Sequence, residues 1–67
     1  MTDDLDAAKA EFVEALPECW YVLEEFPEEF HVTIGTLGGE EAQVFRVAKP
    51  TTGADALRDA IARAKAR

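Results

Sequence analysis

The sequence predicts an α+β domain of the order αβββα, in which two helices pack on one face of a three-stranded antiparallel sheet. Apolar residues recur with helical spacing near both ends of the chain, and they alternate with a period of two in its middle. A Gly-Gly pair separates two of the alternating stretches, as in a hairpin. The length of 67 residues has room for a single domain, residues 1–67.

Residues 2–16 are predicted to form the first helix. Its apolar positions lie three, four or seven residues apart and form one stripe: Leu5, Ala8, Phe12, Ala15 and Leu16. Thr2, Asp3 and Asp4 are candidates for the N-cap, and the two carboxylates suit the positive end of the helix dipole. Pro17 ends the helix because a proline has no N–H to donate.

Residues 20–26 are ambiguous between helix and strand. Trp20 and Tyr21 are strand formers, whereas four apolar residues keep helical spacing: Cys19, Val22, Leu23 and Phe26. Pro17 and Pro27 leave room for only about two helical turns between them, which is too short for a stable helix and suits a strand. We therefore predict a strand over residues 20–26, with either Trp20 or Tyr21 pointing to the face away from the helices.

Residues 30–36 and 42–49 are predicted to form a hairpin. A two-residue turn at Gly39-Glu40 would pair Gly38 with Glu41. The resulting register places apolar pairs on one face and polar pairs on the other: Val32 opposite Val47, Ile34 opposite Phe45, Thr33 opposite Arg46 and His31 opposite Ala48. One face of the sheet is then apolar and the other is open to solvent or to a partner.

A second helix is predicted from Thr52 nearly to the end of the chain. Thr52 is its N-cap, Gly53 lies just inside it, and Asp55 occupies the third position as in an acidic capping box. Asp59 and Arg63 are spaced to form an ion pair. Its inner stripe is apolar: Ala54, Leu57, Ile61 and Ala64. Both helices are expected on the apolar face of the sheet.

The charge is strongly acidic and unevenly distributed. Fourteen acids and seven bases give a net charge of −7. Residues 1–41 hold twelve acids and one base, Lys9, a net charge of −11, whereas residues 42–67 hold two acids and six bases, a net charge of +4. The balance disfavours nucleic acid and anionic membrane as direct partners. The twelve acids either form one acidic surface or serve only for solubility.

The residue inventory excludes most enzyme classes. There is no Ser or Asn, one His and one Cys, so a serine triad or a multi-His metal site cannot form, and we expect no enzyme activity, cofactor or metal. Cys19 is predicted to be a small buried apolar residue, too far from His31 for a dyad. The acidic start and the lack of a run of ~20 apolar residues favour a soluble, cytoplasmic protein.

The order of elements resembles the double-stranded-RNA-binding domain. Tyr21-Val22-Leu23-Glu24-Glu25 and Phe30-His31-Val32-Thr33-Ile34 are similar to the first two strands of that family. The family's lysine cluster at the start of the last helix has no counterpart in Thr51-Thr52-Gly53-Ala54-Asp55. An acid at this place would repel phosphates, so the resemblance implies the fold and not RNA binding.

The first functional hypothesis is a non-enzymatic inhibitor that mimics nucleic acid. In size, charge and lack of chemistry the chain is similar to the small acidic inhibitors carried by phages, of the anti-CRISPR and anti-restriction kind. This resemblance implies a basic partner surface on a nucleic-acid-handling complex, such as a CRISPR effector in the host cytoplasm. The residues expected to bind it are seven acids and two aromatics: Glu11, Glu14, Glu18, Glu24, Glu25, Glu28, Glu29, Trp20 and Tyr21.

The alternative hypothesis is a small structural or assembly subunit that interacts through its open sheet face or an edge strand. Trp20, Thr33 and Arg46 would then matter more than the acids. A monomer or a weak homodimer is expected in either case.

Overall fold

The computed structural model describes residues 5–66 and has the predicted order of elements. These are α1 (Leu5–Ala15), β1 (Cys19–Glu25), β2 (Glu29–Thr36), β3 (Ala42–Ala48) and α2 (Gly53–Lys65). The strand over residues 20–26 is confirmed against the helical alternative, and every strand boundary lies within one residue of the prediction. The predicted caps of the first helix, Thr2, Asp3 and Asp4, lie outside the described residues.

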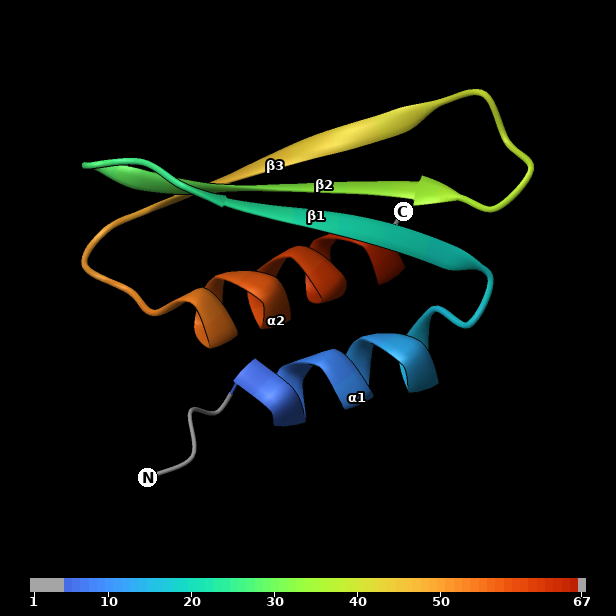
Figure 1. The fold of residues 1–67 in the computed structure, drawn as a ribbon, viewed down its shortest axis with the longest axis horizontal. Helices are drawn as coiled ribbons and strands as arrows, with labels where there is room; N and C mark the ends of the chain where they lie inside the picture. Colours follow the sequence, from blue (N-terminus) through green and yellow to red (C-terminus); the bar gives the residue numbers. More distant parts are fainter. Residues whose placement is uncertain (1–4, 67) are drawn as a thin grey trace.

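The molecule has two layers, a sheet and a pair of helices. The three strands are antiparallel in the order β1-β2-β3, so β1 and β3 are both edges. Both helices lie side by side under the same face of the sheet, as predicted, and no other element covers the opposite face within residues 5–66 (Figure 1). The β1–β2 turn lies at the end of the sheet where α2 begins, and the β2–β3 loop lies at the opposite end (Figure 1).

The hydrophobic core lies between the two layers. Its buried side chains come from α1, β2 and α2: Ala8, Phe12, Phe30, Val32, Ile34, Ala54, Ala56, Leu57, Ala60 and Ile61. Val32 and Leu57 are fully buried at its centre. Ala56 and Ala60 were not on the predicted inner stripe; they are buried because α2 contacts both the sheet and α1, so its buried face is wider than one stripe.

The C-terminus of α1 and the N-terminus of α2 follow the predicted local rules. α1 ends at Ala15, two residues before Pro17. Thr52 is the N-cap of α2 and accepts a hydrogen bond from the Asp55 N–H at 3.1 Å. The i,i+4 ion pair of α2 is also present, with Arg63 Nη2 at 2.9 Å from Asp59 Oδ2.

The predicted register of the β2–β3 hairpin is wrong by two residues. Val32 pairs with Phe45, and Gly35 with Ala42, where the β2–β3 pairing ends. The connection is longer than predicted because Gly38, and not Gly39, takes the positive φ of 81° in a turn closed by the Gly39 N–H on the Thr36 carbonyl. A shift of two residues keeps every side chain on its predicted face, so the apolar face itself is confirmed.

Candidate interaction surface

The face of the sheet turned away from the helices is the surface that we call the open face. Twelve residues form it: Trp20, Val22, Glu24, Phe26, Glu29, His31, Thr33, Gly35, Ala42, Val44, Arg46 and Ala48. Cross-strand neighbours arrange them in four rows: Trp20–Gly35–Ala42, Val22–Thr33–Val44, Glu24–His31–Arg46 and Phe26–Glu29–Ala48. Thr33 and Arg46 were predicted to lie on this face, and the observed pairing confirms both. Of Trp20 and Tyr21, between which the prediction was open, Trp20 lies beside them.

One half of the open face is apolar and accessible to solvent. Six large apolar side chains are exposed in residues 5–66, and four of them lie on the open face: Trp20, Val22 and Val44 in this half, and Phe26 at the other end. Trp20 is 38% exposed, Val22 is 47% exposed and Val44 is 56% exposed. A cluster of large apolar side chains on a face that no helix covers is typical of a binding surface.

Gly35 holds the exposed indole of Trp20 against the sheet. A Cβ on Gly35 would come 2.3 Å from Trp20 Cζ2, far inside van der Waals contact, so the indole occupies the space that any side chain at this position would need. Ala42, the other neighbour of Gly35 in this row, is also small. The ring therefore lies over the central strand, and its outer surface faces solvent.

The other half of the open face is a polar cluster around Glu29. Glu29 Oε2 lies 2.6 Å from His31 Nε2, and Arg46 Nη2 donates to the same oxygen at 3.4 Å. The ring of Phe26 packs on the His31 imidazole, with 4.3 Å between the ring centroids. These contacts connect the β1–β2 turn to β3 across the central strand.

The pKa of Glu29 lies below its ordinary value of 4.5. The hydrogen bond to His31 is the largest cause, because it stabilises the ionised carboxylate. Desolvation raises the pKa and opposes this effect, and the hydrogen bond from Arg46 with its positive charge lowers the pKa further. Glu29 is therefore held in its charged form in the folded protein.

The four acids around the β1–β2 turn do not share one surface. Glu24 and Glu29 lie on the open face, whereas Glu25 lies on the opposite side of the strand and forms an ion pair with Lys49 Nζ at 2.7 Å. Glu28 lies in the turn, and its carbonyl accepts the Lys49 N–H. The charge of two of these acids, Glu25 and Glu29, is thus partly offset by neighbouring bases.

The remaining predicted acids lie elsewhere on the molecule. Glu11 of α1 accepts from Arg58 Nε at 3.0 Å, and Glu14 follows it on the same helix. Glu18 precedes β1 and lies at the far end of the sheet, where its carbonyl accepts the Leu37 N–H. Glu40 and Glu41 are in the β2–β3 loop at that end (Figure 1). The described acids are therefore not gathered on one face of the molecule but are spread over α1 and both ends of the sheet.

Of the two aromatic candidates, the structure leaves only Trp20 on the open face. Tyr21 points to the helical layer, where its ring packs edge-on against Phe12 with 4.8 Å between centroids. It is half-buried beside the core. Tyr21 is therefore a packing residue between β1 and α1.

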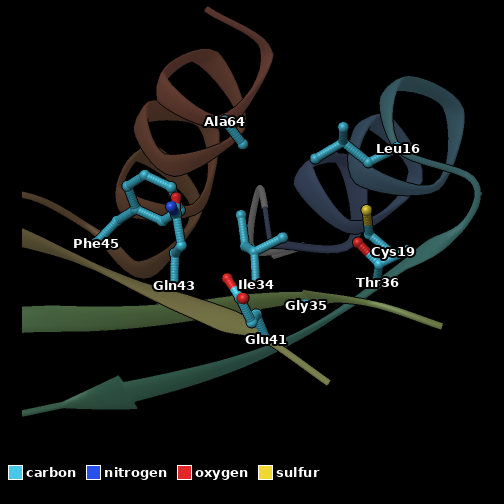
Figure 2. Close-up of a pocket in the computed structure, with 9 residues that line it drawn as sticks. All are labelled: Leu16, Cys19, Ile34, Gly35, Thr36, Glu41, Gln43, Phe45 and Ala64. Atoms are coloured by element: carbon cyan, nitrogen blue, oxygen red, sulfur yellow. The ribbon is translucent and has the colours of Figure 1, made fainter. Parts of the chain in front are cut away.

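Cys19 lines a shallow pocket at the end of the helical layer. Figure 2 shows its sulfur beside Leu16, with Ile34 and Ala64 on the other walls. The pocket has a volume of about 270 Å³, and three of its other lining residues are polar: Thr36, Glu41 and Gln43. Cys19 pairs with Thr36 and lies on the helix side of the sheet, whereas His31 is on the open face five ladder positions away, so the two residues do not form a dyad.

The edge of β3 is partly occupied by a side chain of α2. The Lys49 N–H points toward β2 and donates to the Glu28 carbonyl at 3.0 Å. The backbone groups of successive residues in an antiparallel strand point alternately toward and away from the neighbouring strand, so the N–H and C=O of Arg46, three residues earlier, point away from β2. Arg63 Nη1 donates to this outward carbonyl at 3.1 Å. An added strand would have to displace Arg63, so the edge of β3 is less suited to a partner than the open face.

Comparison with protein-family models, curated proteins and solved structures finds no match to this chain. In residues 5–66 no three His, Cys, Asp or Glu side chains lie close enough to hold a metal ion. Neither described helix is long and apolar enough to span a bilayer.

Three features of this surface had weak or no signals in the sequence. The stacking of Phe26 on His31 depends on how the β1–β2 turn folds back. The contact of Trp20 with Gly35 depends on the β1–β2 register. Its one signal in the sequence was the glycine inside a predicted strand, which often marks a place where another group approaches the backbone closely. The contact of Arg63 with β3 joins residues distant in sequence.

Proposed function

We propose that this chain is a non-enzymatic binding protein whose partner docks on the open face of the sheet. The observation that carries the proposal is the exposed apolar half of this face, formed by Trp20, Val22 and Val44. A partner would remove the exposed apolar surface of these side chains from water. Full burial of such a side chain contributes about 1.5–3 kcal/mol, and since each is only about half exposed, covering the remainder would contribute roughly 1 kcal/mol. A large aromatic ring near the centre of such a patch is a typical anchor of a protein interface.

The polar half of the face supports the same proposal. Glu29, His31 and Arg46 satisfy one another's polar groups within the folded chain, so covering them does not leave an isolated charge. An apolar patch bordered by paired charges is the usual arrangement of an interface core and its rim.

Two valines of similar exposure allow a matched test. Val44 is 56% exposed on the open face, and Val13 is 64% exposed on α1, on the opposite side of the molecule. We expect Val44→Glu to abolish capture of a partner from cell extract, and Val13→Glu, which adds the same charge, to leave it unchanged. Equal capture by both variants would rule out the open face as the binding surface.

A second candidate function is the acidic inhibitor that docks on the basic surface of a nucleic-acid-handling complex. The observation that favours it is the set of exposed acids without an ion pair among the described residues: Asp6, Glu14, Glu18, Glu24, Glu28, Glu40 and Glu41. Such charges raise the association rate with a basic partner and are screened by salt.

The two candidates differ in their response to charge removal and to salt. Changing Glu24, Glu25, Glu28 and Glu29 together to Gln would abolish binding by the acidic inhibitor, whereas binding through the apolar half of the open face would persist. Salt between about 0.1 and 1 M would release a partner held by the acids and not one held by Trp20 and Val44.

A further inference from the structure

The open face is self-complementary, and the geometry points to a second copy of this chain as its partner, in a face-to-face homodimer. This inference rests on the proposed function of the open face and names its occupant. A symmetric dimer in which both copies use the same sheet face has its two-fold axis between the two sheets, parallel to both. An axis along the central strand β2 would place β1 of one copy over β3 of the other and keep every row in register.

This arrangement brings opposite charges together in the third row of the open face. Glu24 lies on β1 and Arg46 on β3, on either side of His31. The two-fold axis therefore places Glu24 of each copy over Arg46 of the other, which forms two ion pairs. Arg46 has an exposed side chain, and its one contact with Glu29, at 3.4 Å, leaves other guanidinium N–H groups that can donate to Glu24 of the second copy.

Side-chain size is also complementary across the axis. In the second row, Val22 of each copy would face Val44 of the other, which joins the two exposed valines into one apolar contact. In the first row, the large Trp20 on β1 would face the small Ala42 on β3. Side chains from the inner faces of two packed sheets interdigitate in this way and form the core between them.

The position of Trp20 matches the normal spacing of packed sheets. Its indole lies over Gly35 on the central strand, and thus beside the axis, where it would stack on the indole of the second copy. Two rings parallel to the sheets would need three contacts of about 3.5 Å, which together would fill the ~10 Å that separates sheets packed face to face. A side chain at position 35 would prevent this stacking.

The charge and the area of the face suit a reversible dimer. Of the twelve acids in residues 5–66, two lie on the open face, Glu24 and Glu29. The axis places Glu24 opposite Arg46 and Glu29 opposite Glu29 of the second copy, where the His31 and Arg46 side chains beside each Glu29 carboxylate offset the repulsion. Three strands ~4.8 Å apart with seven or eight residues of ~3.3 Å rise offer roughly 350 Å² per copy before side-chain relief. Standard interfaces use about 800 Å² per partner, so a face of this size is expected to form only a weak, reversible dimer.

The test uses the symmetry of the charge pairs. Sedimentation equilibrium of the full chain between about 1 µM and 1 mM should show a monomer–dimer equilibrium. Glu24→Arg alone would place Arg over Arg46, and Arg46→Glu alone would place Glu over Glu24, so we expect each to weaken the dimer about tenfold or more. A 1:1 mixture of the two variants restores both ion pairs and should dimerise at least as well as the original chain. Glu14→Arg, with the same charge change on α1, is the matched control and should dimerise normally.

Three results would overturn this inference: a monomer throughout the concentration range, a dimer that Glu24→Arg and Glu14→Arg affect equally, or a mixture of variants that does not associate. Circular dichroism of each variant shows whether it is folded. A monomeric chain whose capture of another partner is lost in Val44→Glu and kept in Val13→Glu would refute the second copy and leave the proposed function intact. Such a result would identify a different protein as the occupant of the open face.

Discussion

The two faces of the central sheet carry similar residues in opposite states. On the covered face, Phe30, Val32 and Ile34 are at most 7% exposed. On the open face, Val22 and Val44 are 47% and 56% exposed. Both sets alternate along strands of one sheet, so their residue types do not account for the difference.

The difference comes from what the chain itself supplies to cover each face. Four buried residues of α2 pack against β2 and α1: Leu57 and the alanines Ala54, Ala56 and Ala60. The small alanine side chains let the two helices and the sheet approach closely. No comparable element is available for the other face in residues 5–66. An apolar face thus becomes part of the core or stays exposed to solvent according to whether another part of the chain reaches it.

The largest effect is expected when one apolar residue that packs against the covered face is truncated and is compared with one that lies on the open face. Leu57→Ala leaves a cavity in the core and should cost about 2–5 kcal/mol of the free energy of unfolding. This is a large fraction of the roughly 3–10 kcal/mol expected for a chain of 67 residues. Val44→Ala removes a side chain that is already exposed and should cost less than about 1 kcal/mol. Urea denaturation at low protein concentration measures both.

The same pair of variants also examines whether the open face is covered in solution. If Val44→Ala costs as much as Leu57→Ala, the two faces do not differ in the way described. A cost of Val44→Ala that increases with protein concentration is expected from the dimer, because the side chain is then buried by the second copy.

An intermediate effect is expected at the contact between Trp20 and Gly35. Gly35→Ala displaces the indole, which should destabilise the fold by about 1–3 kcal/mol and shift the emission of this single tryptophan to the red. In a Trp20→Ala background the same change should cost little or even stabilise β2, since alanine is better tolerated than glycine in a strand. Additive effects in the double variant would show that the two residues are not coupled.

The smallest effect is expected from pH acting on the polar half of the open face. The pKa of Glu29 is lower in the folded protein than its ordinary value of 4.5, so the folded state binds fewer protons than the unfolded state near that pH. The stabilisation from Glu29 is complete above pH 4.5 and is lost as the pH falls through the lowered pKa. Glu29→Gln should therefore reduce the loss of stability between about pH 5 and pH 2. Glu14→Gln on α1 is the control, and an equal reduction by that variant would contradict the assignment to Glu29.

Much of the fold could be predicted because it depends on local patterns. Pro17 and Pro27 bounded β1, alternation defined β2 and β3, and Thr52 with Asp55 marked the start of α2. These signals operate within a few residues, where backbone sterics and hydrogen bonding are independent of the rest of the chain.

The interaction surface was predicted less well because it depends on register and on contacts between distant segments. The turn was expected at Gly39-Glu40, whereas Gly38 adopts the positive φ and the Leu37 N–H bonds to the Glu18 carbonyl before β1. Sequence could not distinguish these turns, because each of the two glycines tolerates that backbone conformation. The positions of the acids relative to one another could not be read from local patterns either. They depend on tertiary contacts, and ion pairs such as Glu11–Arg58 join residues far apart in sequence.

The sequence by itself determined the element types, their order and which residues share a face of the sheet. Side-chain alternation has a period of two, so even a register error of two residues left each face unchanged. Only the tertiary structure decided that Trp20, and not Tyr21, lies on the open face, that Gly35 accommodates its indole, and that the acids are divided between separate places. The physical reason is that these features depend on the packing of helices and strands against one another, which no local spacing along the chain encodes.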